Sequence, residues 1–436
     1  MKVLKWVLLL AVAAAAFLAG GWLLRRGATA NGDRSPSGAD VATNNRLFSA
    51  VLQTVRSYAV DSLDESSIYR LATSGMLNQL GDPYAGVVAD ADTADARTRI
   101  GPAPVQGVYL DTSDDLIAVV AVIPGSPAAI AGFRSGDAVL RVDRTAISTQ
   151  RADQVARMLD GPAGTQVKVR LGRERASAPL VVTLARGAVP PLAEPAFALQ
   201  DGTGYLKLLR VDEEAVAAAV AGAAKVDAVA GRRGLILDLR GAAAGSLEAA
   251  AKLADLFLAE GQAIVIARGR NGKDSTMIRD RVPAAGSDFP IVVLTDRGTG
   301  GPAEVVAGAL QDHDRAAVVG EETFGRGVHY SFFPLGNGTS LRLTTAVWVT
   351  PSGRVIQRLP LPDRPETSTD SAPPRPRFKT DAGRTVLGGG GITPDREIST
   401  GLEADGGDRA LALARDLLSR ATSRQSLTAA LQTKAK

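Results

Sequence analysis

The segment GLILDLR, residues 234–240, decides the fold of this chain. It is a fully apolar run that ends in charge, which is typical of a strand buried inside a parallel sheet. Similar runs are GYLKLL, AIVIARGR and IVVLTD, at residues 204–209, 263–270 and 291–296, with helical patterns over 211–230 and 246–258. This alternation of strands and helices predicts an α/β layered domain.

Length and composition limit the possible functions. A chain of 436 residues is too long for one ordinary core, so two or three domains are expected. The net charge is only +4 and no basic block lies beside aromatic residues, so nucleic acid is not an expected partner. There are no cysteines and only two histidines, His313 and His329, which excludes disulfides, thiolate sites and a histidine-rich metal centre. We therefore expect no metal and no cofactor.

The first thirty residues predict export. Lys2 and Lys5 precede an unbroken apolar run over residues 6–24, which Arg25-Arg26 closes. A helix of that length just spans a bilayer, so residues 1–30 are predicted to anchor the chain in the inner membrane of the cell envelope, with its bulk in the periplasm or another extracytoplasmic space. Ala28-Thr29-Ala30 also matches the small-residue pattern of a signal cleavage site, so the alternative is a cleaved signal and a secreted protein.

A linker over residues 31–43 leads into a predicted helical region, residues 44–98. Apolar residues recur there at helical spacing and predict two or three short helices that end at Asp82-Pro83, since proline interrupts a helix. The apolar residues are Leu47, Val51, Val55, Ile68, Leu71, Met76 and Leu80.

Residues 104–187 contain short β-rich runs and one helix. The string GSPAAIAGFRSGDAVLRVD, residues 125–143, resembles the helix-turn-strand signature of PDZ domains. The resemblance implies that a peptide C-terminus adds as a strand beside a loop whose N–H groups receive the carboxylate. That loop would be Val105-Gln106-Gly107-Val108, with Tyr109 and Leu110 entering the strand. The alternative is a PDZ domain that only packs against its neighbour.

The chain as a whole resembles the carboxyl-terminal processing peptidases, also called tail-specific proteases. The resemblance implies a multidomain α/β fold: the N-terminal helical segment, the PDZ domain, a peptidase-like α/β core over 190–400, and a C-terminal helical segment over 401–436. The matching strings, in order, are GDPY (81–84), GLILDLR (234–240), EVVAGALQDHDRAAVVGEETFG (304–325), TTAVWVTPSGRVIQ (344–357) and FKTDAGRTVLGGGGITPD (378–395).

The same resemblance implies that the catalytic residues are missing. Members of this family use a serine at the start of a helix, a lysine in F-G-K-G as its base, and a supporting glutamine. Those positions hold Gly301, Arg326 and Tyr330 here. Glycine has no hydroxyl, and arginine stays protonated in proteins and cannot act as a general base.

The region implied to bind the oxyanion is also changed. Gly245 is retained as the candidate N–H donor, but the Pro-Gly expected before it is Ala243-Ala244. Two other residues are candidate substitutes for the missing catalytic groups. Thr299 is the nearest hydroxyl, and His329 is close in sequence to the base position.

These observations predict an inactive, membrane-tethered homologue that binds peptide or protein C-termini as a scaffold or as a regulatory subunit. The alternative is an active serine-type endopeptidase that cleaves near protein C-termini with relocated catalytic residues. Expected partners are C-terminal or extended peptide segments, the membrane through residues 6–24, and a second copy or another envelope protein. The apolar spacing within 401–436 suits a packing helix or a dimer helix equally.

Overall fold

The computed structural model describes residues 38–60, 63–89, 104–113, 116–147, 151–173, 176–270, 276–279, 288–336, 338–358, 375–399, 407–421, 423 and 425–427. Two compact units divide the chain, residues 1–79 and residues 80–436. The predicted anchor, residues 1–30, lies outside the described residues. Within the described part, no helix has both the length and the apolar character needed to cross a bilayer.

The first unit is helical where it is described. It contains α2 (Gly38–Tyr58) and α3 (Glu65–Gln79). Asp64 caps α3, because its side chain accepts a hydrogen bond from the Ser67 N–H at 2.9 Å. Helix α3 ends just before Asp82-Pro83, where the sequence predicts a stop. The predicted helical region 44–98 also contains an unexpected strand, β1 (Gly86–Ala89), which belongs to the second unit.

A six-stranded, mostly parallel sheet forms the centre of the predicted core domain (residues 190–400), in the order β21-β16-β15-β11-β9-β8. Strand β8 alone runs antiparallel, against β9. The segment GLILDLR supplies β11, whose residues are all buried, and it pairs in parallel with β9 and β15. The strands are β8 (Ala196–Gln200), β9 (Thr203–Lys207), β11 (Gly234–Asp238), β15 (Ile291–Thr295), β16 (Ala317–Gly320) and β21 (Arg396–Glu397).

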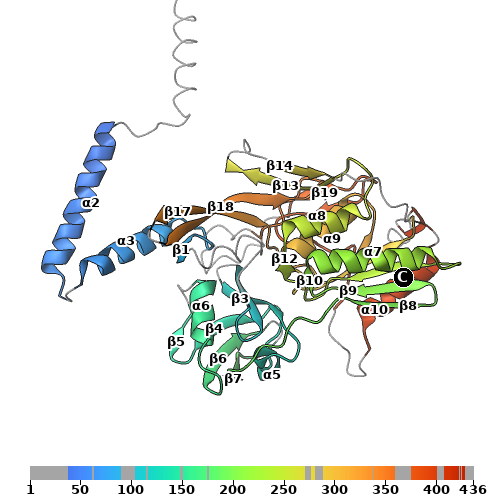
Figure 1. Ribbon diagram of the computed structural model, residues 1–436, viewed down its shortest axis with the longest axis horizontal. Coiled ribbons are helices and arrows are strands. Elements are labelled where there is room, and N and C mark those ends of the chain that lie inside the picture. The colour runs from blue at the N-terminus through green and yellow to red at the C-terminus, as the bar shows by residue number, and fades with distance from the viewer. Residues whose placement is uncertain are drawn as a thin grey trace, which may run out of the picture. The chain divides into compact units, whose positions relative to one another are not determined.

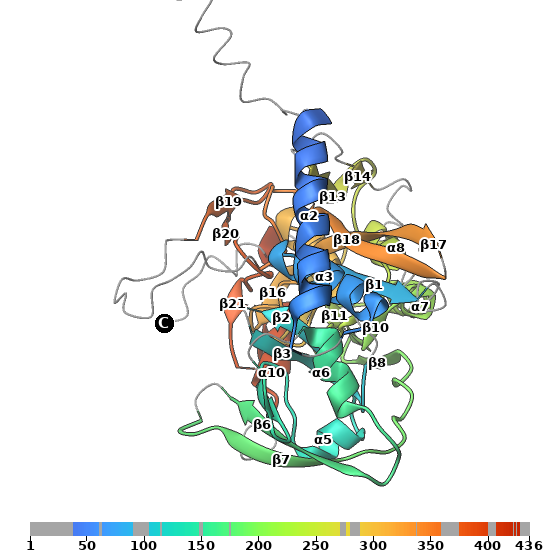
Figure 2. The same ribbon diagram turned by 90° about the vertical axis from the view of Figure 1, so that its left-hand side faces the viewer.

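Helices cover both faces of this sheet, as the apolar strands require. Leu235 and Leu237 pack in a cluster with α7 (Glu213–Asp227), α8 (Leu247–Asp255) and α9 (Pro302–Asp312). Ile236, between them in the sequence, packs instead with α10 (Arg409–Arg420), because successive side chains of a strand point to opposite faces. Figure 2 shows α10 on one side of the sheet and α7 and α8 on the other.

A second, antiparallel sheet belongs to the same unit. Its order is β1-β18-β13-β14, with β17 also paired to β18 (Figure 1). The strands are β13 (Ala263–Gly269), β14 (Thr276–Arg279), β17 (Val328–Gly336) and β18 (Thr339–Val349). Two short pairs complete the domain: β10 (Arg210–Val211) with β12 (Ala244–Gly245), and β19 (Arg377–Lys379) with β20 (Thr385–Leu387).

The PDZ-like domain (residues 104–187) is a separate sheet with its own core. The strands follow the order β2-β3-β4-β6-β7, so β2 is an edge strand, and α6 packs beside it. The elements are β2 (Val108–Ser113), β3 (Leu116–Val122), α5 (Pro127–Ala131), β4 (Ala138–Val142), β5 (Thr145–Ala146), α6 (Ala152–Leu159), β6 (Gln166–Gly172) and β7 (Leu180–Ala185).

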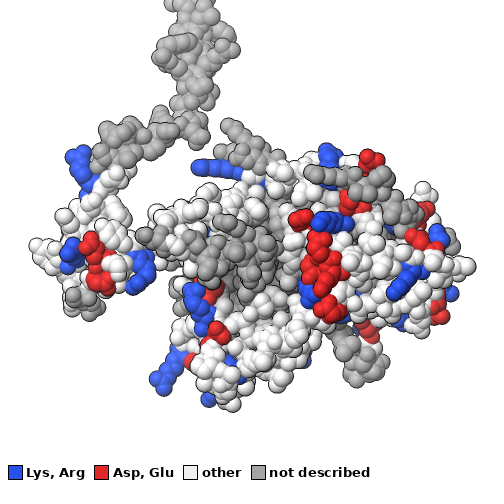
Figure 3. Space-filling model, viewed as in Figure 1, with Lys and Arg blue, Asp and Glu red and all other residues white. Residues whose placement is uncertain are grey.

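Charge on the described surface is mixed. Figure 3 shows acidic and basic side chains side by side over the face it presents, without an extended basic area among the described residues. On α7 and α8, Lys252 contacts Glu213 at 2.7 Å and Glu248 at 3.1 Å. Such interspersed charge gives no surface on this face suited to a nucleic-acid backbone.

Candidate functional site

The turn from β15 into α9 holds the position where the sequence predicts a missing nucleophile. Gly301 is buried at the start of α9, with φ 61° and ψ −116°. A residue with a side chain rarely adopts this backbone conformation, whereas glycine adopts it without strain. Pro302 follows at the first helical position, where its missing N–H costs nothing. The turn thus presents backbone only at this point.

Glu304 joins this turn to the loop that carries the predicted base position. Its Oε2 accepts hydrogen bonds from the backbone N–H groups of Gly301 and Arg326, both at 2.8 Å. Its Oε1 accepts from the Gly325 N–H at 2.7 Å and from the Thr323 hydroxyl. Burial raises the pKa of Glu304 to about 7, although these four donors act against the shift. Its role is to fix two loops.

Thr299 is a structural part of the same turn. It is fully buried, and its hydroxyl accepts a hydrogen bond from the Asp296 N–H at 3.0 Å. The hydroxyl's one proton is shared between the Leu239 carbonyl at 2.9 Å and the Asp296 carboxylate at 3.1 Å. The oxygen is therefore engaged with the turn and does not face a substrate.

Arg326, at the predicted base position, is buried and paired with an acid. It is 1% exposed, and its Nε donates to Asp111 on β2 of the PDZ-like domain, which is also 1% exposed. Burial acts to lower the pKa of Arg326, but the facing Asp111 carboxylate outweighs it and holds the pKa above its ordinary value. Arg326 therefore stays charged and cannot take a proton from a nucleophile.

The surroundings of Arg326 differ from what its chemistry suggests. The planar guanidinium is expected to find several polar partners, yet Nη1 and Nη2 are buried and have none among the described residues. Its carbon atom lies 5.6 Å from the centre of the Phe324 ring, a distance typical of a cation–π contact. Arg326 is thus held by one carboxylate and one ring, both close to fully buried.

Tyr330, at the predicted glutamine position, belongs to an aromatic group on β17. Its ring lies 6.4 Å from that of Tyr84 at an interplanar angle of 27°, and 5.8 Å from Phe332 edge-on. The Arg342 guanidinium lies over Tyr330, 5.5 Å from the ring centre. Burial, with a smaller effect from Asp111, raises the pKa of Tyr84 well above its ordinary value. Tyr84 and Tyr330 lie near enough to Arg326 to act on its pKa.

The loop predicted to bind the oxyanion is now an apolar contact. Ala243 and Ala244 pack in one cluster with Phe324 and with residues of the PDZ-like domain, namely Tyr109, Val120, Ala121 and Ile123. Gly245 lies in β12 at φ 137°, and a Cβ there would lie 2.1 Å from the Val211 carbonyl oxygen. Glycine is therefore needed at 245 for the close approach of β10, whatever its N–H contacts.

Strand β3 of the PDZ-like domain lies directly over the turn that precedes Gly301. A Cβ placed on Gly300 would lie 3.4 Å from Val120 Cγ1, and one on Gly298 would lie 3.2 Å from the Val120 carbonyl oxygen. The glycines at these positions therefore allow the two domains to approach closely. Ala243, Ala244 and Arg326 therefore lie at the contact between the PDZ-like domain and the core domain.

The residues predicted to read a peptide lie at the start of β2. Gln106 and Gly107 have positive φ values of 50° and 87°, and a Cβ on Gly107 would lie only 2.0 Å from Ser126 Cβ. The Gln106 side chain accepts a hydrogen bond from the Gly187 N–H at 2.9 Å, which holds the loop. Val105 and Val108 form an isolated bridge, so the Val108 N–H is already donated to Val105.

Side chains of β2 alternate between two cores. Leu110 packs inside the PDZ-like domain, whereas Tyr109 packs toward the core domain. What β2 offers a ligand is therefore its backbone edge beside α6, and its role in peptide binding stays a prediction.

The sequence did not indicate two residues of this site, Asp111 and Tyr84. It also suggested one residue, His329, that does not belong to the site. Asp111 and Tyr84 gave no local signal, since Asp111 contacts a residue 215 positions away. His329, the candidate substitute base, is exposed on β17, and desolvation lowers its pKa below the ordinary value. Among the described residues, no three His, Cys, Asp or Glu side chains gather where they could hold a metal ion.

Comparison with known proteins agrees with this architecture. The pattern of Peptidase family S41 matches residues 202–363, and that of the PDZ domain matches residues 119–173. A carboxy-terminal-processing protease of Bartonella bacilliformis is 32% identical over 71% of this chain and 72% of its own length. A carboxyl-terminal-processing protease of Synechocystis sp. is 31% identical over 66% of this chain and 68% of its own.

A solved structure shows the same fold. The photosystem II D1 C-terminal processing protease is 24% identical, with a TM-score of 0.62 over 86% of this chain and 92% of that chain. At this identity the likeness concerns the fold alone. With a relative more than 30% identical over more than two thirds of its length, and with both domains matched in order, the chain belongs to the family of carboxyl-terminal processing serine proteases.

Proposed function

We propose that this chain is a catalytically inactive, membrane-tethered member of its family that binds peptide C-termini as a scaffold or regulatory subunit. One observation carries the proposal. Glycine occupies the nucleophile position, and a buried arginine paired with Asp111 occupies the base position. Acyl transfer by this type of site needs a hydroxyl and a base that can be neutral, and this arrangement supplies neither.

The packing of the two domains supports the same proposal. Ala243, Ala244 and Phe324 contact β2 and β3 of the PDZ-like domain, where an active site needs room for a peptide. Val120 covers the turn before Gly301. A substrate carbonyl would have to displace this apolar cluster to approach Gly301, and would still meet no nucleophile.

Peptide binding is proposed for the edge of β2. An edge strand has unpaired backbone groups that can pair with an added strand, and α6 provides the second wall of such a groove. The loop at Gln106 and Gly107 keeps the positive φ values that turn successive N–H groups in one direction. Membership of a family that processes C-termini supports a C-terminal peptide as the ligand.

Location in the cell envelope rests on the sequence. The apolar run over residues 6–24 between basic residues favours an anchor, and Ala28-Thr29-Ala30 favours cleavage and secretion as the alternative. Both place the PDZ-like and core domains outside the cytoplasm. A second copy of the chain or another envelope protein stays a proposed partner.

The alternative function is an active endopeptidase with relocated residues. Thr299 is its best nucleophile and His329 its best base, but the Thr299 hydroxyl is engaged within the turn and His329 is exposed on a strand. These contacts favour the inactive form.

One experiment separates the two functions. The full-length chain is titrated with a fluorescent peptide that has an apolar C-terminus, with the same peptide amidated, and the peptides are then recovered for mass spectrometry. We expect the free acid to bind more tightly than the amide by roughly tenfold, because a charged acceptor makes the stronger hydrogen bonds, and both peptides to be intact. Equal affinity for the free-acid and amidated peptides would show that the protein does not recognise the C-terminal carboxylate. Cleavage lost on Thr299→Ala would establish the alternative.

A further inference from the structure

A cavity between the PDZ-like domain and the core domain has no role in the function proposed above. Its volume is about 350 Å³, within the range of small-molecule sites. Lys207 ends β9, Arg240 and Gly241 follow β11, and Asp296 follows β15, so the cavity lies at the carboxyl edge of the parallel sheet. That edge is where open α/β sheets generally bind ligands.

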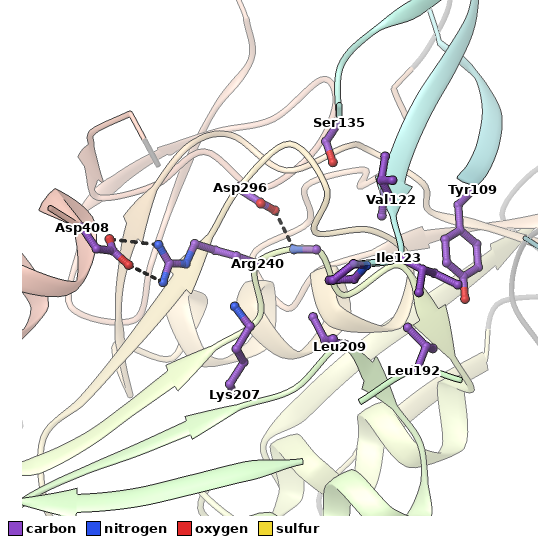
Figure 4. Close-up of a pocket in the computed structure, with 13 residues that line it drawn as sticks. Tyr109, Val122, Ile123, Ser135, Leu192, Lys207, Leu209, Arg240, Asp296 and Asp408 are labelled. Carbon is purple, nitrogen blue, oxygen red and sulfur yellow. Dashed lines mark hydrogen bonds and ion pairs between the residues drawn. The ribbon is translucent and has the colours of Figure 1, made fainter. Parts of the chain in front are cut away.

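One wall of this cavity is apolar and comes from both domains. Tyr109 and Ile123 belong to the PDZ-like domain and are 5% and 4% exposed, whereas Leu192 and Leu209 belong to the core domain and are half-buried (Figure 4). This wall suits an aliphatic or aromatic group of a ligand.

The other wall is polar, and most of its hydrogen-bonding capacity is used. Arg240 donates to Asp238 through Nε and Nη2 at 2.9 and 2.7 Å, and it contacts Asp408 at 3.0 and 2.8 Å (Figure 4). Asp408 also caps α10 by accepting from the Leu411 N–H at 3.0 Å. Arg240 and Asp408 are therefore satisfied without a ligand.

Two groups of the polar wall have capacity left. The Lys207 ammonium lies 3.6 Å from Asp238 Oδ2, beyond hydrogen-bonding distance, and its side chain is 38% exposed. Asp296 accepts hydrogen bonds from Gly241, Gly298 and Thr299, all through Oδ1, so Oδ2 has no hydrogen-bond donor among the described residues. One cation and one carboxylate oxygen are thus available on the cavity wall.

The two groups with capacity left indicate the kind of ligand. Asp238 and Asp408 already contact Arg240, and Asp238 lies near Lys207, so charges of both signs surround the cavity. A ligand that carries both an anionic and a cationic group matches Lys207 and Asp296. We propose that this cavity binds a free α-amino acid with an apolar side chain, its carboxylate on Lys207, its ammonium on Asp296, and its side chain against Tyr109, Ile123, Leu192 and Leu209.

Calorimetry on the full-length chain tests the proposal, with leucine and phenylalanine as ligands. We expect saturable binding of at least one of them. The matching amino-acid amide lacks the carboxylate and the N-acetyl amino acid lacks the ammonium, so each should bind at least about tenfold more weakly. Equal affinity of the amide, or no heat from either amino acid, would overturn the proposal.

Variants locate the site. Lys207→Met should weaken binding by about tenfold or more, whereas Lys252→Met, which removes an exposed lysine on α8, should leave it unchanged. Leu192→Trp fills the cavity and should abolish binding even if Lys207→Met fails to fold. Normal binding by a folded Leu192→Trp chain contradicts the location.

A peptide C-terminus is the alternative ligand of the cavity. Its last residue has a carboxylate but no free α-ammonium group. A peptide that ends in leucine and binds in a Lys207-dependent manner, while free leucine does not bind, would replace the amino acid as the ligand. The proposal does not depend on the inactivity of the chain, since the cavity includes neither Gly301 nor Arg326.

Discussion

Arg326, at the predicted base position, has a packing role that can be described at the residue scale. Its only polar side-chain partner among the described residues is Asp111, and both side chains are buried. Removing one member of such a pair leaves a buried charge uncompensated. We expect Asp111→Asn to lower the free energy of unfolding in urea by about 3–5 kcal/mol.

The control for this prediction is an exposed ion pair. Glu248→Gln removes the contact with Lys252 on α8 and should cost about 0–1 kcal/mol. If Asp111→Asn costs no more than Glu248→Gln, the buried pair does not join the two domains as described.

Glu304 gives the chain a pH-dependent stability. Burial raises its pKa from 4.5 to about 7, so between these values the folded chain holds a proton that the unfolded chain releases. The free energy of unfolding should therefore fall as the pH rises from 4.5 to 7, by about 3 kcal/mol in the limit, since one pKa unit corresponds to about 1.4 kcal/mol.

Other carboxyl groups titrate in the same range, so the Glu304 contribution is taken as a difference. Urea unfolding of the wild type and of Glu304→Gln is measured at several pH values, and the variant should lack this part of the slope. In Glu304→Gln, the side-chain NH₂ group would face the N–H groups of Gly301, Gly325 or Arg326, which are donors and need an acceptor. The variant should therefore be less stable than the wild type at every pH. Parallel curves would mean that Glu304 does not titrate.

The loop before β2 gives a prediction at the scale of elements. A Cβ on Gly107 would lie 2.0 Å from Ser126 Cβ, so Gly107→Ala must move the loop away from α5. We expect this variant to lose binding of the free-acid peptide while the chain stays folded by circular dichroism. Gly164→Ala is the matched control, because Gly164 also has positive φ but nothing within 4 Å of an added Cβ. Equal binding by both variants would place the peptide elsewhere.

Elements with local signals could be predicted from sequence, whereas contacts between distant elements could not. The apolar runs predict β9, β11 and β15, and helical spacing predicts α3, because periodicity reports which face is buried. Strand β1 was not predicted, since four residues carry little pattern and its pairing with β18 joins segments far apart in the chain.

The candidate site also contains residues that the sequence indicates and residues that it does not. Resemblance located Gly301, Arg326 and Tyr330, but not the partners that now fill their surroundings. Asp111 is 215 residues from Arg326, and Tyr84 reaches Tyr330 from the segment before β1. Packing between domains depends on the finished fold, so no spacing along the chain indicates it.

At the scale of the whole molecule, the sequence of the N-terminal run predicts where the chain resides. Full-length protein should sediment with membranes, and a chain that starts at Asn31 should be released, because residues 6–24 are long enough to span the bilayer core. Fractionation followed by N-terminal sequencing checks this. A soluble full-length product that begins at Asn31 would show that the segment is a cleaved signal.

The central claim is that this family member does not hydrolyse peptides, and a reversion series tests it most directly. Denatured protein is incubated with wild type, Gly301→Ser, Gly301→Ser with Arg326→Lys, and both of these with Tyr330→Gln. The single variant has a serine without a base, and Ala243-Ala244 still pack against the PDZ-like domain. One lost oxyanion donor alone commonly costs about 10²–10³ in rate. We predict no cleavage by the wild type or by Gly301→Ser, and measurable cleavage only from the triple variant, if from any. Robust turnover by the wild type, or by Gly301→Ser alone, would contradict the account.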